Sequence, residues 1–308
     1  MSRYRREFSV AATYAGLLLI LAVAAPSFFQ PDQLRALAVS QSSVLVAAVG
    51  MTLVIVARQI DISIGSQFSI CGVVAGLLAR AGVPTPLVAL ATVATGAGLG
   101  AVNGALVAGL GLPSIVVTLA TLVILRESLR WVREGEQVRN LPGWFQWFGA
   151  GQSMGQWLVV GSALVVFAVF AWGMRNLSAG RAVYATGSDP EAARLAGIRP
   201  QRVVFGVFVA MGALAAFGAL LNALRFADLE TNAGGGLELQ AIAAVVVGGA
   251  AVSGGRGTLV GTLVGVLLLG TLGPALTFLH VPAQWEKAVQ GVVILLAVAS
   301  DALDRRGK

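Results

Sequence analysis

The chain contains about ten apolar stretches, each long enough to cross a lipid bilayer as a helix. They fall at residues 10–30, 36–57, 62–80, 86–108, 113–132, 157–174, 202–224, 237–253, 257–274 and 284–300. Of the 308 residues, 57% are hydrophobic and 11% are charged, whereas a soluble domain has about a quarter charged residues. So few charges cannot give a chain of this size a polar surface. The sequence therefore predicts an all-α, polytopic transmembrane helical bundle of about ten spans.

The distribution of charge predicts the orientation of this bundle. The net charge is +7, but the basic residues lie mostly at the ends of apolar stretches, which does not indicate nucleic-acid binding. With a cytoplasmic N-terminus, about 13 Lys and Arg residues lie on the inner side and about 8 on the outer side. We therefore expect one transmembrane domain, 1–308, with residues 1–9, 175–201 and 301–308 in the cytoplasm. The first stretch is too long for a secretory signal and is expected to remain as a helix.

Two divisions between neighbouring stretches are short. Arg58, Gln59 and Asp61 separate the second stretch from the third, and residues 253–256 separate the eighth from the ninth. Either break could separate two spans or interrupt one discontinuous helix.

Glycine recurs every four residues in two of the stretches. Gly96, Gly100 and Gly104 form one ridge, and Gly257, Gly261 and Gly265 form another. Such ridges let helix backbones approach closely within lipid. The ridges occupy matching places when spans two to five are compared with spans seven to ten, which is consistent with an inverted repeat or with two independent ridges.

The segment 180–198, between the sixth and seventh stretches, has the pattern of a short capped helix. Ser188 or Asp189 can cap its N-terminus, Pro190 suits the first turn, and Glu191 favours the positive end of the helix dipole. Gly197 is expected to end the helix. We expect this helix to lie outside the membrane.

This segment, Gly-Arg-Ala-Val-Tyr-Ala-Thr-Gly-Ser-Asp-Pro-Glu-Ala-Ala-Arg-Leu-Ala-Gly-Ile, resembles the cytoplasmic coupling loop of the ribose-type sugar permeases of bacterial ABC importers. Residues 60–66 resemble the Gly-Gly-Ile-Asp-Leu-Ser-Val-Gly signature of that family, and residues 237–249 with 254–257 resemble its glycine-rich region. Arg58 and Gln59 stand where the family usually has two glycines. The chain therefore looks more similar to the autoinducer-2 and rhamnose branch than to the ribose member.

The resemblance implies a type II ABC importer-like fold and a permease subunit of the bacterial inner membrane, which forms the path for a sugar or sugar-like solute of the ribose, rhamnose or autoinducer-2 class. The partners it implies are ATP-binding subunits that use ATP-Mg, a second permease subunit in a homo- or heterodimer, and a periplasmic sugar-binding protein. In the family, the coupling loop docks into a groove of the ATP-hydrolysing subunit. The coupling residues implied here are Gly187, Ser188, Asp189, Glu191, Ala192, Ala193, Arg194 and Gly197.

Asp61 is the charged residue of the signature-like segment, together with Ser63 and Gly65. Its carboxylate could pair with Arg58, cap the following helix, or hold a gate closed.

The outer side carries a polar patch between the seventh and eighth stretches, formed by Arg225, Asp228, Glu230, Asn232 and Glu238 around Gly234–Gly236. Amide and carboxylate groups can bind sugar hydroxyls, so Asn232 and Glu238 are candidates for the substrate path. The alternative is a solvated loop that docks an external binding protein or nothing at all. Arg126, Glu127, Arg130 and Arg133 are interpreted as a snorkelling charged cap.

The sequence lacks the phosphate loop Gly-x-x-x-x-Gly-Lys-Ser/Thr, so we expect a transport subunit that does not itself hydrolyse ATP. We expect no catalytic residue, no metal site and no cofactor bound by this chain. Two alternatives stay open: a branched-chain amino acid permease, which looks broadly similar, and an ion-coupled secondary transporter.

Overall fold

A computed structural model of the chain describes residues 5–282 together with residues 285, 288–289, 291–292 and 295. Helix accounts for 77% of the structure, and the described residues contain no strand. The nearest approach to a sheet among them is an isolated antiparallel bridge between Val138 and Leu229. The predicted all-α class is confirmed.

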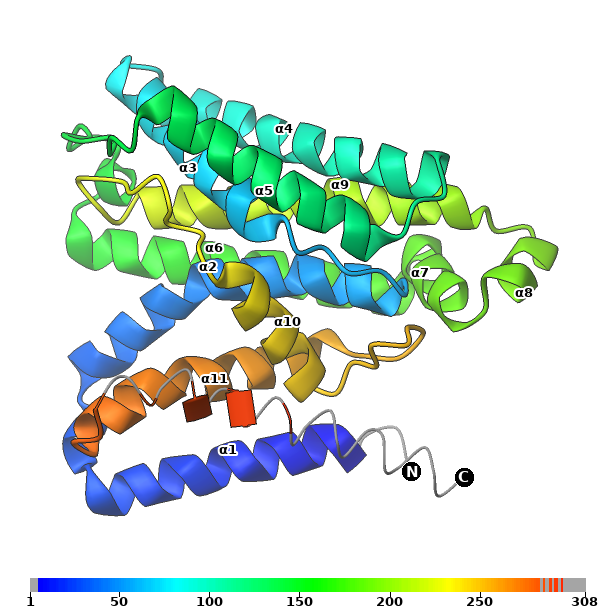
Figure 1. Cartoon of the computed structure of the whole chain (residues 1–308). Helices are drawn as coiled ribbons and strands as arrows, with labels where there is room; N and C mark the ends of the chain where they lie inside the picture. Colours follow the sequence, from blue (N-terminus) through cyan, green and yellow to red (C-terminus); the bar gives the residue numbers. More distant parts are fainter. Residues whose placement is uncertain (1–4, 283–284, 286–287, 290, 293–294, 296–308) are drawn as a thin grey trace.

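The helices follow one another with short connections (Figure 1). They are α1 (Arg5–Ala24), α2 (Pro31–Val56), α3 (Ile64–Arg80), α4 (Thr85–Gly104), α5 (Ser114–Arg133), α6 (Gln152–Asn176), α7 (Ser178–Ser188), α8 (Pro190–Leu195), α9 (Pro200–Ala223), α10 (Leu237–Val247) and α11 (Leu259–Phe278). Two 3-10 turns, η1 (Pro26–Phe29) and η3 (Gln146–Gly149), precede α2 and α6, and a π-helical turn, η2 (Ala105–Gly109), extends α4. Proline opens α2, α8 and α9, because it lacks the amide hydrogen that the first helical turn leaves unpaired.

Five helical segments of the described chain are long and apolar enough to cross a membrane: α2, α4 with η2, α6, α9 and α11. The expectation of about ten spans is therefore not confirmed. Helices α3 and α10 occupy predicted stretches but have only 17 and 11 residues. Helix α5 has 20 residues but carries four charged side chains in its second half. The predicted tenth stretch, 284–300, lies almost entirely outside the described residues.

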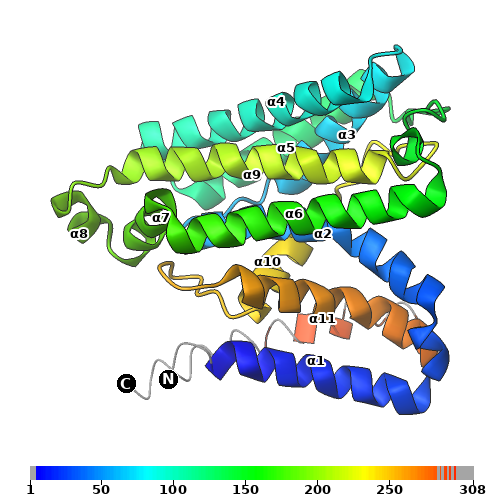
Figure 2. The ribbon, with the colours of Figure 1, turned by 180° about the vertical axis from the view of Figure 1, so that it is seen from behind.

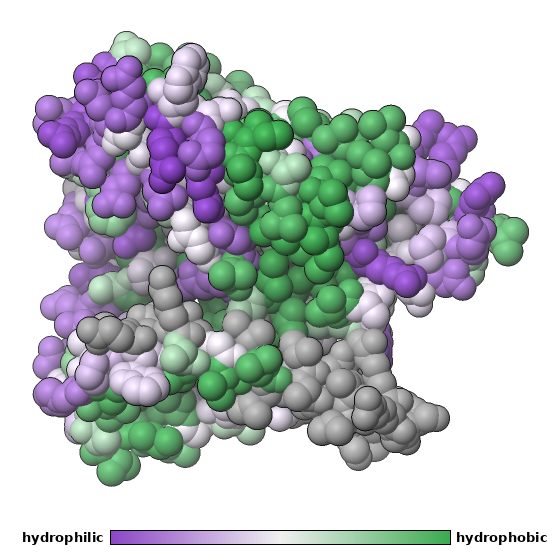
Figure 3. Space-filling view, in the orientation of Figure 1, coloured by the Kyte–Doolittle hydropathy of each residue, from purple (hydrophilic) through white to green (hydrophobic). Residues whose placement is uncertain are grey.

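The helices run alternately between two ends of an elongated body (Figure 1). The start of α1, the end of α2, the helices α7 and α8, and the start of α9 lie at one end, here called the inner end. The turn after α3, the end of α5 and the end of α9 lie at the other, the outer end (Figures 1 and 2). Apolar residues form a broad area between polar ends on the face shown in Figure 3. This banding suits a body surrounded by lipid.

Helix α2 lies at the centre of the body, where 89% of its most apolar 18-residue window is buried. Its sequence is apolar on every side, which is the pattern of a helix surrounded by others. Helix α9 packs along α2 and is sandwiched between α2, α3 and α4. These two helices form the core against which the shorter elements are placed.

The first glycine ridge packs as predicted. A methyl group at Gly96 would overlap the carbonyl oxygen of Gly212 in α9, and one at Gly100 would overlap the carbonyl oxygen of Phe208. The second ridge has a different neighbour: Gly261 and Gly265 of α11 face the backbone of α10 and the residue after it. The ridges therefore serve different helix pairs, and their matching positions in the sequence are not by themselves evidence for a repeat.

Two segments of non-helical backbone lie within the body, one before α3 and one before α10. After α2 ends at the inner end, residues 57–63 turn back without helical structure before α3 begins. After α9 ends at the outer end, residues 225–236 turn back before α10 begins (Figure 1). The predicted break near 58–61 is therefore a reversal between α2 and α3. The predicted break near 253–256 also lies between separate helices, because α10 ends at Val247 and α11 begins at Leu259. Helices α3 and α10 are half-helices that start inside the body and run in opposite directions.

Candidate functional site

Four buried polar residues gather where α3 begins, and we call them the polar core cluster: Asp61, Ser63, Gln67 and Asn103. None is more than 1% exposed. The Ser63 hydroxyl donates to Asp61 Oδ1 at 2.6 Å and accepts from Gln67 Nε2 and from Asn103 Nδ2, each at 2.8 Å. Gln67 Nε2 also donates to Asp61 Oδ2 at 3.3 Å. The cluster joins the segment 57–63 to α3 and α4.

The segment 57–63 is also attached to α5. The Ile60 amide donates to Ser114 Oγ at 3.2 Å, and the Thr118 hydroxyl donates to the Ile60 carbonyl at 3.4 Å. These bonds satisfy backbone groups that a helix would otherwise pair, as the membrane interior requires. Two amide oxygens of the cluster, Gln67 Oε1 and Asn103 Oδ1, are buried and find no hydrogen-bond partner in the part of the chain that the structure describes.

Of the roles considered for Asp61, the structure supports a local one. Asp61 Oδ1 accepts from the Ser63 amide at 2.9 Å, which forms a turn immediately before α3. In the described part of the chain, no ion pair joins Asp61 to Arg58. Arg58 has a left-handed backbone conformation, with a φ of 65°. Sequence reasoning missed Gln67 and Asn103, although an amide inside an apolar stretch is a signal of a buried polar partner.

The two half-helices meet at Gly65 and Gly234. A methyl group on either glycine would overlap the backbone of the other segment. The Gly234 amide also donates to Ser69 Oγ of α3 at 3.0 Å. Gly65 was predicted only from its place in the signature-like segment. The structure explains why this position is a glycine, because no side chain fits there.

Glu238 lies in the first turn of α10 and is 8% exposed. Its carboxylate reaches Gly65 in the first turn of α3, so it lies near the positive ends of two helix dipoles. Arg126 Nη2 of α5 lies 3.6 Å from Glu238 Oε1, while Glu238 Oε2 is buried and has no hydrogen-bond partner among the described residues. Arg126 is therefore not only part of a snorkelling cap, because its charge faces the junction of the half-helices.

The structure brings Glu238 to this junction but leaves Asn232 in an exposed turn of the outer segment. In that turn the Gly235 amide donates to the Asn232 carbonyl at 3.0 Å. The outer segment is attached to the connection before α6: Val138 and Leu229 exchange two backbone bonds, and the Asn140 amide donates to Asp228 Oδ1 at 2.9 Å.

At the inner end, α7 and α8 form a compact pair of helices. Asp189 Oδ1 accepts from the amides of Glu191 and Ala192 at 2.9 and 3.1 Å, so Asp189 is the cap rather than Ser188. Gly197 has a φ of +82°, and the next amide, that of Ile198, donates to the Ala193 carbonyl. This is the glycine termination that the sequence predicts.

The predicted coupling residues divide into two sets. Gly187 and Ala193 are buried, and the remaining six, Ser188, Asp189, Glu191, Ala192, Arg194 and Gly197, are exposed. Leu195, which sequence reasoning did not select, is 91% exposed at the end of α8.

Helix α7 contacts the end of α2 and the glycine-rich loop before α11. Any side chain at Gly187 would overlap the Val56 carbonyl, and the same carbonyl accepts from the Gly255 amide at 2.9 Å. The Tyr184 hydroxyl donates to the Gly257 carbonyl at 2.8 Å. Because Val56 immediately precedes the segment 57–63, continuous contacts lead from α7 to the polar core cluster.

The helical body, its half-helices and the polar residues at their junction define a membrane protein of the transporter class. The chain belongs to the family described as "Branched-chain amino acid transport system / permease component", whose sequence profile matches residues 33–298. No solved structure gave a significant match.

Relatives of known name match nearly the whole chain. The ribose import permease protein RbsC of Escherichia coli strain K12 is 35% identical over 92% of this chain and 90% of the relative. The autoinducer 2 import system permease protein LsrC of Salmonella typhi is 31% identical over 96% of this chain and 85% of the relative. The corresponding LsrC of Shigella flexneri is 33% identical over 85% and 77%. The predicted resemblance to the ribose-type permeases is confirmed, and the chain is a transport permease subunit. The expected greater similarity to the autoinducer-2 branch is not confirmed, because the identity to RbsC is 35% and the identities to the two LsrC proteins are 31% and 33%.

Proposed function

We propose that the chain forms the translocation path of an ATP-driven ABC importer for a sugar or sugar-like solute of the ribose, rhamnose or autoinducer-2 class. The observation that carries this proposal is the 35% identity to a ribose import permease over 92% of the chain. The autoinducer-2 permeases support the same class, because they match over a similar length.

The arrangement that we propose has ten crossings of a bacterial inner membrane, with both termini in the cytoplasm. The half-helices α3 and α10 each complete a crossing with the non-helical segment that precedes them. The unit α2, 57–63 and α3 corresponds to the unit α9, 225–236 and α10 in the opposite direction, which supports an inverted repeat. In this orientation α7 and α8 face the cytoplasm.

In this proposal, separate ATP-binding subunits use ATP-Mg, and the chain itself binds no cofactor. They contact the exposed residues of α8 around Asp189, Arg194 and Leu195. Closure of these subunits moves α7 and α8, and contacts at Gly187 and Val56 transmit the movement to the segment 57–63. Asp61, Ser63 and Gly65 then act at the gate that the half-helices form.

A second permease subunit, identical or closely related, encloses the path with this chain. A periplasmic sugar-binding protein delivers the solute to the outer segments. Glu238 offers an unpaired carboxylate oxygen to a sugar hydroxyl, and Asn232 lies at the exposed approach to it.

A branched-chain amino acid is the second candidate cargo, because the family description names that class. The named relatives do not favour it, since they import ribose and autoinducer-2 according to their names. An ion-coupled secondary transporter is also not favoured, because the matched profile describes a permease component of a transport system.

Reconstitution tests the proposal. The chain is co-purified with its ATP-binding subunit and binding protein, and uptake of labelled ribose, rhamnose, autoinducer-2 and leucine into proteoliposomes is measured with and without ATP. We expect ATP-dependent uptake of one sugar-like solute and none of leucine. Uptake of leucine, or uptake driven by an ion gradient without ATP, would contradict the proposal.

The coupling segment is tested in the same preparation. Leu195→Asp should abolish at least about nine-tenths of ATP-dependent uptake, because a charge at this exposed apolar position weakens docking of the ATP-binding subunit. The control is Leu110→Asp, which places the same charge on another exposed leucine, in the turn between η2 and α5 and outside α7 and α8. Leu195→Asp with full uptake would exclude α8 as the docking helix.

A further inference from the structure

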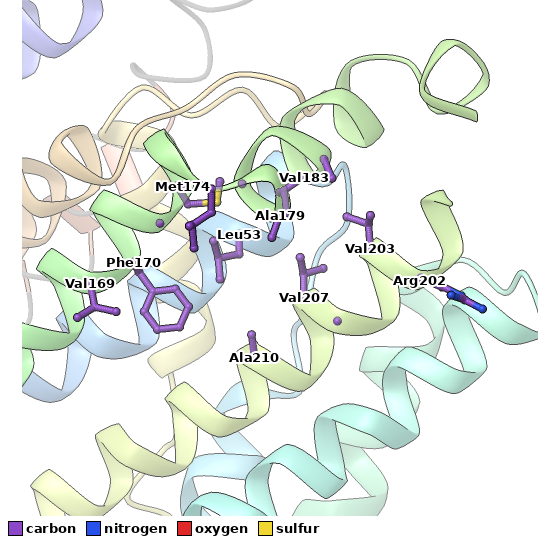
Figure 4. A pocket seen from close by; sticks show the side chains of 15 residues that line it. Leu53, Val169, Phe170, Met174, Ala179, Val183, Arg202, Val203, Val207 and Ala210 are labelled. Atoms are coloured by element: carbon purple, nitrogen blue, oxygen red, sulfur yellow. The ribbon is translucent and has the colours of Figure 1, made fainter. Parts of the chain in front are cut away.

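An apolar groove lies between α6 and α9. These two helices are in front in the view of Figure 2, on the side of the body away from α5 and α10. Helix α7 closes the groove at the inner end (Figure 4). Its volume is about 490 Å³. Leu53 of α2, Val183 of α7 and Val207 of α9 are buried at its floor, so the groove extends past the outer helices to the central one.

The lining of the groove is almost entirely apolar. Of the 15 residues that line it, all except Arg202 have apolar side chains or are glycine. In a membrane this hollow faces hydrocarbon, and leaving it empty would forfeit dispersion contacts along its whole wall. Acyl chains of the surrounding lipid are the molecules available to fill it.

Arg202 is the charged residue among those that line the groove, and in Figure 4 its side chain lies at the rim and points away from Val203 and Val207. It lies in the first turn of α9, at the inner end of the groove, and takes part in no ion pair within the described part of the chain. Arg175 and Arg181 lie at the same end of the body, in the last turn of α6 and in α7. No acidic residue lines the groove. An apolar channel with an arginine at its interfacial end matches an acyl chain joined to a phosphate.

We propose that this groove binds one phospholipid, with an acyl chain between α6 and α9 and the phosphate at Arg202. Because α7 forms one wall, the lipid fastens α7 to the transmembrane helices at the point where the chain leaves the body for α8. Net anionic headgroups bind more tightly than zwitterionic ones, since the groove offers a positive charge and no negative one. This inference concerns lipid binding and stands apart from the nature of the transported solute.

The groove can be filled by substitution without disturbing the fold. Gly206 lines the groove, is exposed, and has no atom within 4 Å of the position a Cβ would take. Gly206→Leu therefore places a side chain where the lipid chain would lie. The matched control is Gly98→Leu on α4, which is another exposed helical glycine with no atom within 4 Å and lies outside the groove.

Native mass spectrometry of the purified chain, titrated with phosphatidylglycerol, measures the binding. We expect the wild type and Gly98→Leu to retain one phosphatidylglycerol, and Gly206→Leu to bind it about tenfold more weakly. Arg202→Gln should weaken phosphatidylglycerol binding about fivefold and remove its advantage over phosphatidylethanolamine.

Equal retention by the wild type and Gly206→Leu would overturn the proposal, as would a wild type that retains no lipid. An Arg202→Gln variant with unchanged headgroup preference would remove Arg202 from the site. If Gly206→Leu instead separates two copies of the chain, the groove holds a helix of a second subunit and the lipid proposal fails.

Discussion

The half-helices α3 and α10 start side by side, but the segments that lead into them are held by different interactions. Asp61 and Ser63 before α3 are fully buried and hydrogen-bonded to residues of α3 and α4. Before α10, Asp228, Glu230 and Asn232 are exposed, and water can replace their bonds. Buried polar networks resist opening, whereas exposed backbone bonds open easily. The comparison indicates that α3 is the fixed side of the junction and α10 the movable side.

The largest effect should come from removing the close approach that both half-helices share. Gly65→Val places a branched side chain against Gly234 and Glu238, and we expect a loss of about 3 kcal/mol in unfolding free energy. Gly72→Val is the control, because Gly72 lies in the same helix with no atom within 4 Å of a Cβ. Thermal unfolding in detergent compares the two. Equal stability of both variants would show that the half-helices do not touch at Gly65.

A second test compares one carboxylate from each leading segment. Asp61→Ala removes the acceptor of the Ser63 hydroxyl and amide inside the body, and we expect it to lower stability by about 2 kcal/mol. Asp228→Ala removes the acceptor of the Asn140 amide at an exposed site, where water replaces it, and should lower stability by about 0.5 kcal/mol. Equal losses would remove the contrast between a fixed and a movable side.

Asp61→Asn tests the proposed gating role of the Asp61 charge separately from its contribution to stability. The asparagine keeps an acceptor oxygen for Ser63, so most of the stability should remain, while transport falls if the charge holds the gate. Transport is measured as uptake in proteoliposomes. Normal uptake by Asp61→Asn would exclude the gating role.

The last test measures an interaction energy at the movable side. A double-mutant cycle of Arg126→Gln and Glu238→Gln should give a coupling energy of at most about 1 kcal/mol, because the pair is 3.6 Å apart and Arg126 is partly exposed. Uptake should nevertheless fall in Glu238→Gln, because its carboxylate lies at the junction. A coupling energy well above this value would make the ion pair a fixed structural bond and contradict a movable α10.

Local features were predictable from the sequence because neighbouring residues determine them. The cap at Asp189 and the termination at Gly197 depend on residues only a few positions away, and both were predicted at the right place. The first glycine ridge indicated close packing, because only small residues permit it. The partner of that ridge, Gly212, lies more than 100 residues away and was not predicted.

Proximity in the sequence was misleading for the charged groups. Arg58 was considered as the partner of Asp61 because it is close in the sequence. In the structure Gln67 and Asn103 complete the cluster instead, and Asn103 is 40 positions from Ser63, to which it donates. Arg126 and Glu238 belong to different stretches and come together because α10 starts beside α5.

By itself, the sequence determined the helical class, the apolar stretches, the coupling-like loop and the family, because each depends on composition or on short motifs. Only the tertiary structure decided that the segments 57–63 and 225–236 lead into half-helices that start side by side within the body. Hydropathy measures how apolar a stretch is and does not say at which depth in the membrane a helix begins. The tertiary structure also decided which polar groups face one another, because a buried group pairs with whatever distant helix packing brings within reach.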